Sequence, residues 1–258
     1  MLRVVKIGGN IVDNPEKLDR FLSDFASLDG AKILVHGGGK VATTIAGALG
    51  IETQMIEGRR VTDRQTLDVV TMVYGGLINK SIVAKLQKLG CNAIGLSGAD
   101  GEFILSKRRD PNPVDYGFVG DPEFVNSHLV KVLTDNDMTV VAAPLTYDKE
   151  GGTLLNTNAD TVASSIAVAM AQAGRQTELI YCFEKRGVLS DVDNDESVIP
   201  HIDPLLYASL KAGGQIFQGM LPKLDNAFRA IESGVESVVI CSAEMIAAKG
   251  YGGTTITR

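Results

Sequence analysis

The sequence is poor in cysteine. Its three residues, Cys91, Cys182 and Cys241, stand far apart in apolar runs. No Cys-x-x-Cys pair and no cysteine–histidine cluster occurs, which argues against a structural zinc site and a disulfide framework. We predict that all three cysteines are small, buried core residues.

Targeting signals are also lacking. The first residues have no signal-peptide apolar region, because Lys6 and the glycines after it interrupt the short apolar run Val4–Ile7. No stretch of the sequence reaches the length that we expect of a membrane span. We therefore expect a cytoplasmic protein without a membrane partner.

An excess of positive charge is missing as well. The chain has 25 Lys and Arg against 31 Asp and Glu, a net charge of −6. This balance argues against a general nucleic-acid binder, although a single basic cleft can still bind a small anion. With 258 residues, 45% hydrophobic and 22% charged, the composition is that of a globular protein.

Short apolar runs alternate with helical patterns along the chain. Val4–Ile7 ends at Gly8-Gly9, and Ile33–Val35 ends at His36 and three glycines. Alternating strands and helices with glycine turns at the strand ends predict an α/β fold with a mostly parallel sheet, covered on both faces. The other predicted strands are 92–96, 140–143, 179–183 and 238–240, with 114–125 outside the main sheet.

Turn and cap residues place the helices. Asn14-Pro15 predicts one helix start, and Asn126 or Ser127 predicts another. Glu57-Gly58 predicts a hairpin turn, and a long helix is expected from Thr62 or Asp63 to Leu89. Two more helices flank Gly213-Gly214. Without a repeat or linker, 1–258 is predicted to be one domain.

Two glycine turns are the first candidate site. Lys6 stands two residues before Gly8-Gly9, at the end of the first predicted strand. Ligands of doubly wound sheets bind beyond the carboxyl ends of the strands, where glycines let backbone N–H groups approach an anion. The turn Gly37–Gly39 opens a helix in the same way. We interpret His36 as a structural hydrogen-bonding residue.

Three further groups extend this candidate site. Arg60, at the end of the predicted hairpin, offers a planar fork that suits a carboxylate or phosphate. The block Asn156–Asp160 precedes a helix, where capping by Asn158 explains one of its three polar side chains. Lys223 enters a helix near its start, where the dipole disfavours a cation, and this indicates a ligand.

Two common nucleotide-binding motifs are absent, and one further segment suggests a different enzyme class. The sequence has no P-loop and no Rossmann glycine fingerprint with a partner acid. The segment Gly95–Ala99 is nearly the nucleophile elbow of a hydrolase, with Ser97 as nucleophile and His128 or His201 to complete a triad. That hydrolase alternative leaves the two lysines and Asp160 unexplained.

Taken together, the motifs resemble the amino-acid kinase family, in particular its acyl-glutamate branch. The matching blocks keep the family's order and cover nearly the whole chain. They are Val5–Gly9, Val35–Gly39, Gly58–Asp63, Gly95–Gly101, Gly117–Gly120, Asn156–Asp160 and Gly219–Lys223.

The resemblance implies an open αβα sandwich with an N-terminal acyl-glutamate lobe, about 1–174, and a C-terminal nucleotide lobe, about 175–258. It implies transfer of the γ-phosphoryl group of ATP, as its Mg²⁺ complex, to the side-chain carboxylate of an N-acyl-L-glutamate in arginine biosynthesis. Mg²⁺ would be held mainly by the ATP phosphates, with no protein ligand. Another kinase of this fold, or a ligand sensor, stays an alternative.

Residue roles follow from the same resemblance. Lys6 and Lys223 would balance charge on the transferring phosphoryl group, and Asp160 would hold both lysines. Gly8 and Gly9 would line the nucleotide phosphates together with the lysines. The substrate would contact Gly38, Gly39, Arg60, Asn156 and Asn158.

Departures from the family pattern are informative. Arg59 replaces a usually apolar residue and would receive a second substrate carboxylate, as in N-succinyl-L-glutamate, or point to solvent. Tyr181–Lys185 replaces a polar turn of the nucleotide lobe, so the adenine contacts stay open. The long N-terminal helix of arginine-inhibited hexamers is missing, which implies a homodimer without arginine feedback.

Overall fold

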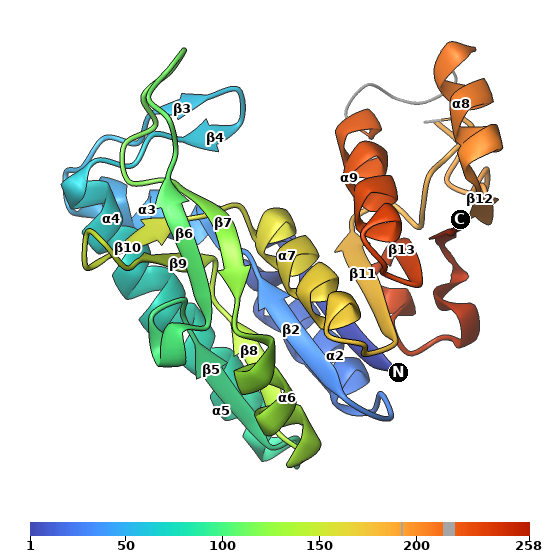
Figure 1. Cartoon of the computed structure of the whole chain (residues 1–258), viewed down its shortest axis with the longest axis horizontal. Coiled ribbons are helices and arrows are strands. Elements are labelled where there is room, and N and C mark those ends of the chain that lie inside the picture. The colour runs from blue at the N-terminus through green and yellow to red at the C-terminus, as the bar shows by residue number, and fades with distance from the viewer. Residues whose placement is uncertain (192, 214–219) are drawn as a thin grey trace.

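Eight strands form the central sheet of the computed structural model (Figure 1), which describes residues 1–191, 193–213 and 220–258. Their order is β12-β14-β13-β11-β1-β2-β8-β5, and all neighbouring pairs are parallel except β13 with β14. The predicted open, mostly parallel sheet is confirmed. The strands are β1 (Leu2–Ile7), β2 (Lys32–His36), β5 (Ala93–Leu96), β8 (Thr139–Ala142), β11 (Thr177–Phe183), β12 (His201–Ile202), β13 (Ser237–Ser242) and β14 (Thr254–Ile256).

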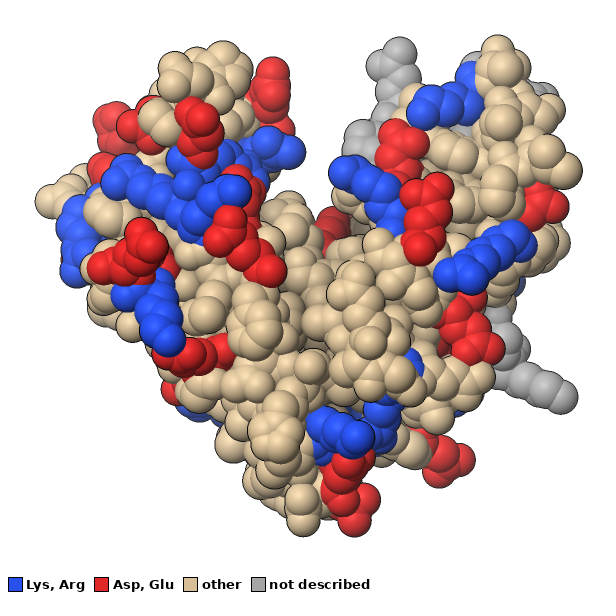
Figure 2. All heavy atoms as spheres, viewed as in Figure 1, with Lys and Arg blue, Asp and Glu red and all other residues tan. Residues whose placement is uncertain are grey.

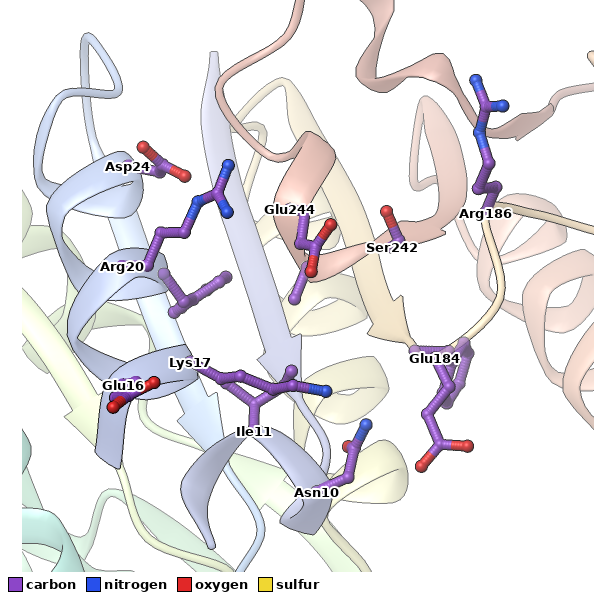
Figure 3. Close-up of a pocket in the computed structure, with 13 residues that line it drawn as sticks. Asn10, Ile11, Glu16, Lys17, Arg20, Asp24, Glu184, Arg186, Ser242 and Glu244 are labelled. Carbon is purple, nitrogen blue, oxygen red and sulfur yellow. The ribbon is translucent and has the colours of Figure 1, made fainter. Parts of the chain in front are cut away.

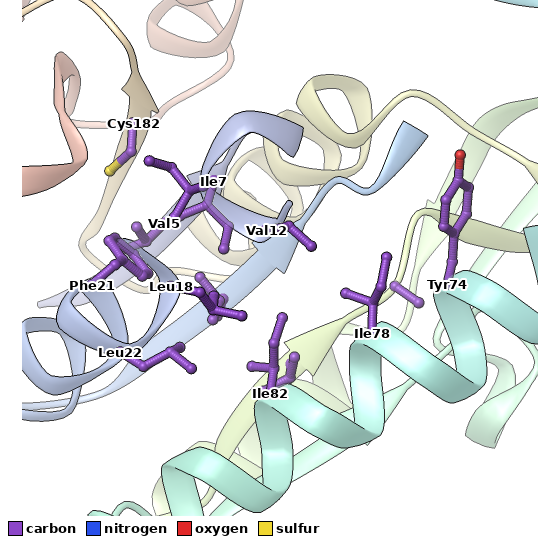
Figure 4. Close-up of a cluster of buried hydrophobic side chains, with 14 of the residues drawn as sticks. Val5, Ile7, Val12, Leu18, Phe21, Leu22, Tyr74, Ile78, Ile82 and Cys182 are labelled. Atoms are coloured by element: carbon purple, nitrogen blue, oxygen red, sulfur yellow. The ribbon is translucent and has the colours of Figure 1, made fainter. Parts of the chain in front are cut away.

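Helices cover both faces of this sheet because successive strand residues point to opposite sides. Val4 of β1 belongs to one core, which it shares with residues of α6, α7 and α9. Its neighbour Val5 belongs to a second core (Figure 4), shared with α2 and α5. The bounds are α2 (Pro15–Ala26), α5 (Asn79–Lys88), α6 (Ser127–Asp135), α7 (Ala159–Gln172) and α9 (Leu221–Glu232).

Side-chain caps start the helices where the sequence predicted them. Asn14 accepts a hydrogen bond from the N–H of Lys17 at 3.0 Å, and Asn126 caps α6 through the N–H of Leu129. Such caps satisfy backbone donors that have no partner inside the helix. Further helices are α1 (Gly9–Val12), α3 (Gly39–Ala48), α8 (Pro204–Ala212) and short 3₁₀ turns at Asp100–Glu102, Ala243–Met245 and Lys249–Gly252.

The predicted long helix runs from Arg64 to Lys88, capped by Asp63. It comprises α4 (Arg64–Val70), a π-helical segment η1 (Thr71–Ile78) that the sequence did not predict, and α5. With 25 residues it is long and apolar enough to span a membrane, so the expectation that no stretch reaches that length was wrong. Its buried side packs into the second core, as Tyr74, Ile78 and Ile82 show in Figure 4.

A smaller sheet lies outside the main one, in the order β10-β9-β6-β7. It contains β6 (Ile104–Arg108), β7 (Gly120–Val125), β9 (Leu145–Asp148) and β10 (Thr153–Asn156). The prediction that 114–125 leaves the main sheet is therefore confirmed. The hairpin β3 (Met55–Ile56) and β4 (Arg59–Arg60) is also confirmed, with Glu57 and Gly58 at φ of 49° and 74° in its turn.

All three cysteines are buried and unbridged, as predicted. Cys182 and Cys241 are neighbours across β11 and β13, and the hydrogen bond between them, with burial, raises the pKa of the Cys182 thiol. An inert thiol of this kind is a packing residue.

Helix α8 ends before Gly213 as expected, whereas Gly214 and Gly219 lie outside the described residues.

Candidate active site

A cleft opens between the arm that carries the β3–β4 hairpin and the arm that carries α9 (Figure 2). Its cavity of about 450 Å³ is bounded by residues that follow the ends of β2, β8 and β10, and by Lys223 and Asn226 of α9. Ligands of open α/β sheets bind beyond these carboxyl ends. Of the predicted site residues, it contains Gly38, Gly39, Arg59, Arg60, Asn156, Asn158, Asp160 and Lys223.

Lys6 and Asp160 form an ion pair beside this cavity. The Nζ of Lys6 lies 2.8 Å from Oδ1 of Asp160, and the lysine is only 7% exposed. Lys6 stands near the end of β1 and Asp160 in the first turn of α7, where the helix dipole favours a carboxylate. The pairing that the resemblance implied for these two residues is therefore present, whereas no ion pair of the described residues joins Asp160 to Lys223.

Lys223 approaches the same place from α9. Its Nζ lies 3.6 Å from the centre of the Phe183 ring, and the Nζ of Lys6 lies 5.2 Å from that centre. Burial lowers the pKa of Lys223, as does repulsion from Lys6, while attraction to Asp160 and Glu184 opposes the shift. Residues 6, 160 and 223, far apart in sequence, thus form one charged cluster with two cations and one carboxylate.

The two glycine turns face each other. A Cβ on Gly9 would lie 3.9 Å from the backbone nitrogens of both Gly38 and Gly39, and a Cβ on Gly37 would lie 3.2 Å from the nitrogen of Gly9. Gly38 has a φ of 149°, and a Cβ there would come within 2.3 Å of Ile78. In the described part of the chain, no hydrogen bond uses the N–H of Gly9, Gly38 or Gly39. These donors can receive an anion.

The side chain of Arg60 is buried and held in place by hydrogen bonds, with only 8% of the residue exposed. Its NH2 nitrogen donates to the Gly39 carbonyl at 2.9 Å and to Thr43 Oγ1 at 2.8 Å, and NH1 donates to Thr53 Oγ1 at 3.1 Å. A guanidinium has five N–H donors, so two of them are left for a ligand. Arg60 therefore holds the second glycine turn and can still bind a carboxylate. Its neighbour Arg59 is exposed at the cavity.

The two asparagines of the block Asn156–Asp160 make hydrogen bonds within the protein and also line the cavity. Asn156 donates to Thr62 Oγ1 at 2.9 Å, which ties the end of β10 to the segment after β4. Asn158 caps α7 by accepting from the N–H groups of Asp160 and Thr161, so the cap prediction is confirmed. Both asparagines line the cavity, and their contact with substrate stays a prediction.

Sequence reasoning missed several residues of the site. Tyr74 lines the cavity from the π-helical segment, and burial raises its pKa. Arg109 lines it from the segment after β6, where its Nε bonds Asp121 Oδ1 at 3.1 Å. Neither lies in one of the motifs that the sequence analysis selected, so only the tertiary fold reveals them. Phe183 was noted only as a departure from the family pattern.

The hydrolase alternative receives no support. The Ser97 hydroxyl donates to Asp100 at 2.8 Å, and no hydrogen bond among the described residues joins it to a histidine. His201 lies on β12, whereas Ser97 follows β5 at the opposite edge of the sheet. No hydrogen bond of the described chain brings His128 to this serine either, so the predicted triad does not form.

A separate hollow of about 610 Å³ lies on the α2 side of the sheet (Figure 3). Its lining residues Phe21 and Ala243 belong to the second core, and acidic and basic side chains surround its mouth. None of the predicted site residues lines it. Over the described ranges, no group of three or more His, Cys, Asp or Glu is arranged to hold a metal ion.

The class of the protein follows from its similarity to known proteins. The model of the amino acid kinase family matches residues 1–242, and the chain belongs to that family. It is 58% identical to an acetylglutamate kinase of Cytophaga hutchinsonii over 95% of this chain and 92% of the relative. It is 52% identical to an acetylglutamate kinase of Parabacteroides distasonis, over 95% of both chains.

A solved structure agrees with the fold. The protein smu.665 from Streptococcus mutans UA159 is 26% identical, with a TM-score of 0.76 over 99% of this chain and 98% of that one. The family, the fold and the enzyme class expected from the sequence motifs are thus confirmed: the chain is a phosphotransferase of the amino acid kinase family.

His36 is a buried hydrogen-bonding residue next to the second glycine turn. It is fully buried, its Nδ1 lies 2.9 Å from the Gly37 carbonyl, and its Nε2 lies 3.2 Å from the amide nitrogen of Asn79. The Asn79 amide also donates to the Val141 carbonyl at 2.9 Å. A neutral imidazole with its proton on Nδ1 satisfies all these contacts. His36 thus has the structural role predicted for it.

Burial lowers the pKa of His36 to about 4. We expect its Cε1–H signal to keep its chemical shift from about pH 8 to about pH 5, assigned with His128→Gln and His201→Gln variants. The unfolded chain binds this proton with a pKa near 6.5, so the free energy of unfolding falls as pH drops from about 6.5 toward 4. A His36 signal that titrates near pH 6.5 would contradict this assignment.

Proposed function

We propose that this chain transfers the γ-phosphoryl group of ATP to the side-chain carboxylate of an N-acyl-L-glutamate, giving ADP and an acyl phosphate, as a step of arginine biosynthesis. The observation that carries the proposal is the convergence of Lys6, Asp160 and Lys223 at a cavity that also contains Arg60. The names of the similar proteins favour the same reaction.

The chemistry needs few catalytic groups. A carboxylate is already ionised at neutral pH, so it attacks phosphorus without a general base, and the bond to the ADP oxygen breaks. Catalysis of phosphoryl transfer rests on alignment and on stabilising negative charge. Lys6 and Lys223 would supply that charge, and Asp160 would keep Lys6 in place. The N–H groups of Gly9, Gly38 and Gly39 would line the path of the phosphate and carboxylate.

Substrate would bind on the hairpin side of the cleft. Two donors of Arg60 and the amide of Asn156 would bind the α-carboxylate, with Asn158 and the glycine turn beside them. ATP would use Gly8, Gly9 and both lysines. Mg²⁺, bound with ATP mainly through phosphate oxygens, would neutralise part of the triphosphate charge. No residue of this chain is proposed as its ligand.

We also propose the two lobes expected from the sequence, about 1–174 for the acyl-glutamate and about 175–258 for the nucleotide. Lys223 and Asn226 line the cavity together with residues of the hairpin, which supports this division. We also propose a cytoplasmic enzyme, on the resemblance alone.

Loss of either lysine tests the proposed function. We expect Lys6→Gln and Lys223→Gln each to lower turnover roughly 10²–10³-fold, about 3–4 kcal/mol, because a preorganised charge at the transition state is lost. ADP release and hydroxylamine trapping of the acyl phosphate measure this. Lys88→Gln, an exposed residue of α5, serves as the control. Wild-type turnover in either site variant, or none in the wild type with any acyl-glutamate, would overturn the proposal.

The acyl group is a separate question. Arg59 lines the same cavity, which supports its pairing with a second carboxylate on the acyl group, as in N-succinyl-L-glutamate. We expect turnover of both N-acetyl- and N-succinyl-L-glutamate. Arg59→Gln should lower kcat/KM about 2- to 5-fold for the succinyl substrate alone, since exposed ion pairs contribute about 0.2–1 kcal/mol. A clear wild-type preference for N-acetyl-L-glutamate would exclude this role of Arg59.

We further propose a homodimer. The long helix exposes Met72 and Leu77, 56% and 53% accessible, on either side of Gly75-Gly76. Exposed apolar patches of this kind often mark protein interfaces. Sedimentation should give a dimer for the wild type and a monomer for a Met72→Glu/Leu77→Glu variant. Leu205→Glu, at an 84% exposed residue of α8, should stay dimeric. A monomeric wild type would contradict this proposal.

A further inference from the structure

The Phe183 ring lies at the centre of the charged cluster, and the proposed reaction gives it no role. It is the last residue of β11, and the ammonium groups of both lysines lie over its ring, at 3.6 Å for Lys223 and 5.2 Å for Lys6. Lys6 also has the Asp160 carboxylate. For Lys223, no ion pair and no side-chain hydrogen bond is found within the described ranges, so the ring is its nearest favourable partner.

A second aromatic residue fixes this ring. Tyr181 points to the same side of β11 as Phe183, and the two rings stack with centres 5.9 Å apart and planes 20° from parallel. Tyr181 is 2% exposed, and its hydroxyl donates to the carbonyl of Asp160 at 3.2 Å. The two stacked rings, which lie next to the lysines, are therefore hydrogen-bonded to the first turn of α7, the turn that carries the Asp160 carboxylate.

The electrostatics explain why a ring suits this position. Two ammonium groups repel each other in a half-buried site. Asp160 forms an ion pair with Lys6, whereas Lys223 is attracted by Asp160 and Glu184 but forms no ion pair with either in the described part of the chain. The face of an aromatic ring attracts a cation through its quadrupole yet carries no net charge. A second carboxylate would also hold Lys223, but it would cancel the positive charge that a phosphoryl group requires.

We propose that Phe183 is a positioning residue, whose ring holds the Lys223 ammonium beside the Lys6–Asp160 pair before ATP binds and leaves the positive charge of the cluster intact. This role rests on the proposed phosphoryl transfer for its kinetic consequence. The placement of Lys223 over the ring is a separate claim, which can be measured in the unliganded protein.

Ring-current shifts test the placement directly. In protein labelled with [ε-¹³C]lysine, the Hε protons of Lys223 should resonate upfield of the other lysines, with Lys223→Arg giving the assignment. Phe183→Leu should abolish the upfield shift, and Phe183→Tyr should keep it. Phe124→Leu, an exposed phenylalanine of β7, should change nothing. An ordinary Lys223 shift in the wild type, or one unaffected by Phe183→Leu, would overturn the proposal.

Kinetics test the consequence. Phe183→Leu should lower kcat about 10-fold, the scale of a desolvated cation–π contact, with the KM of the acyl-glutamate nearly unchanged. Phe183→Tyr should restore kcat. A rise in the KM of ATP alone would mean that the ring stacks on the nucleotide, and a lower melting temperature with unchanged kcat would mean that it only packs. Either result would overturn the proposal.

The proposed function and the proposed role of Phe183 can be disproved separately. If the wild type phosphorylates no acyl-glutamate, the proposed function fails, while an upfield Lys223 signal that depends on Phe183 still supports the placement. If turnover is present and the Lys223 signal is ordinary, the proposed function stands and the role of Phe183 is wrong.

Discussion

The ion pair between Lys6 and Asp160 is the interaction on which the candidate site depends. It joins the end of β1, in the middle of the sheet, to the first turn of α7. Removing a half-buried carboxylate from water is costly, and a charged partner together with the positive end of a helix offsets that cost. The pair thus fixes the strand end, the helix start and the position of the first glycine turn relative to one another.

Around this pair, two packed hydrophobic cores hold the strands, and a cleft leaves the strand ends open to ligands. Two cores on opposite faces of the sheet hold β1, β2 and β11, and the short turns after these strands bring their polar groups to one edge. Arg60 fixes the second glycine turn in the same manner as Asp160 fixes Lys6. The cleft between the two arms leaves this edge accessible (Figure 2). Lys223 of α9 reaches it from the far arm.

Much of this arrangement follows from local sequence patterns. Glycine turns after apolar runs located the strand ends, and caps such as Asn14 and Asn158 located helix starts, because these signals act within a few residues. The pairing of Lys6 with Asp160 came from resemblance to a family, since nothing local joins residues so far apart. The π-helical segment, Tyr74, Arg109 and the ring of Phe183 were not predicted, because their roles arise from tertiary contacts alone.

The most direct measurement is a crystal structure of the chain with Mg²⁺, ADP, a fluoride mimic of the transferring phosphoryl group, and N-acetyl-L-glutamate. Our account predicts that the mimic lies between the Nζ atoms of Lys6 and Lys223, with the acceptor carboxylate in line and the α-carboxylate at Arg60. A nucleotide in the hollow on the α2 side, or a mimic away from both lysines, would contradict it.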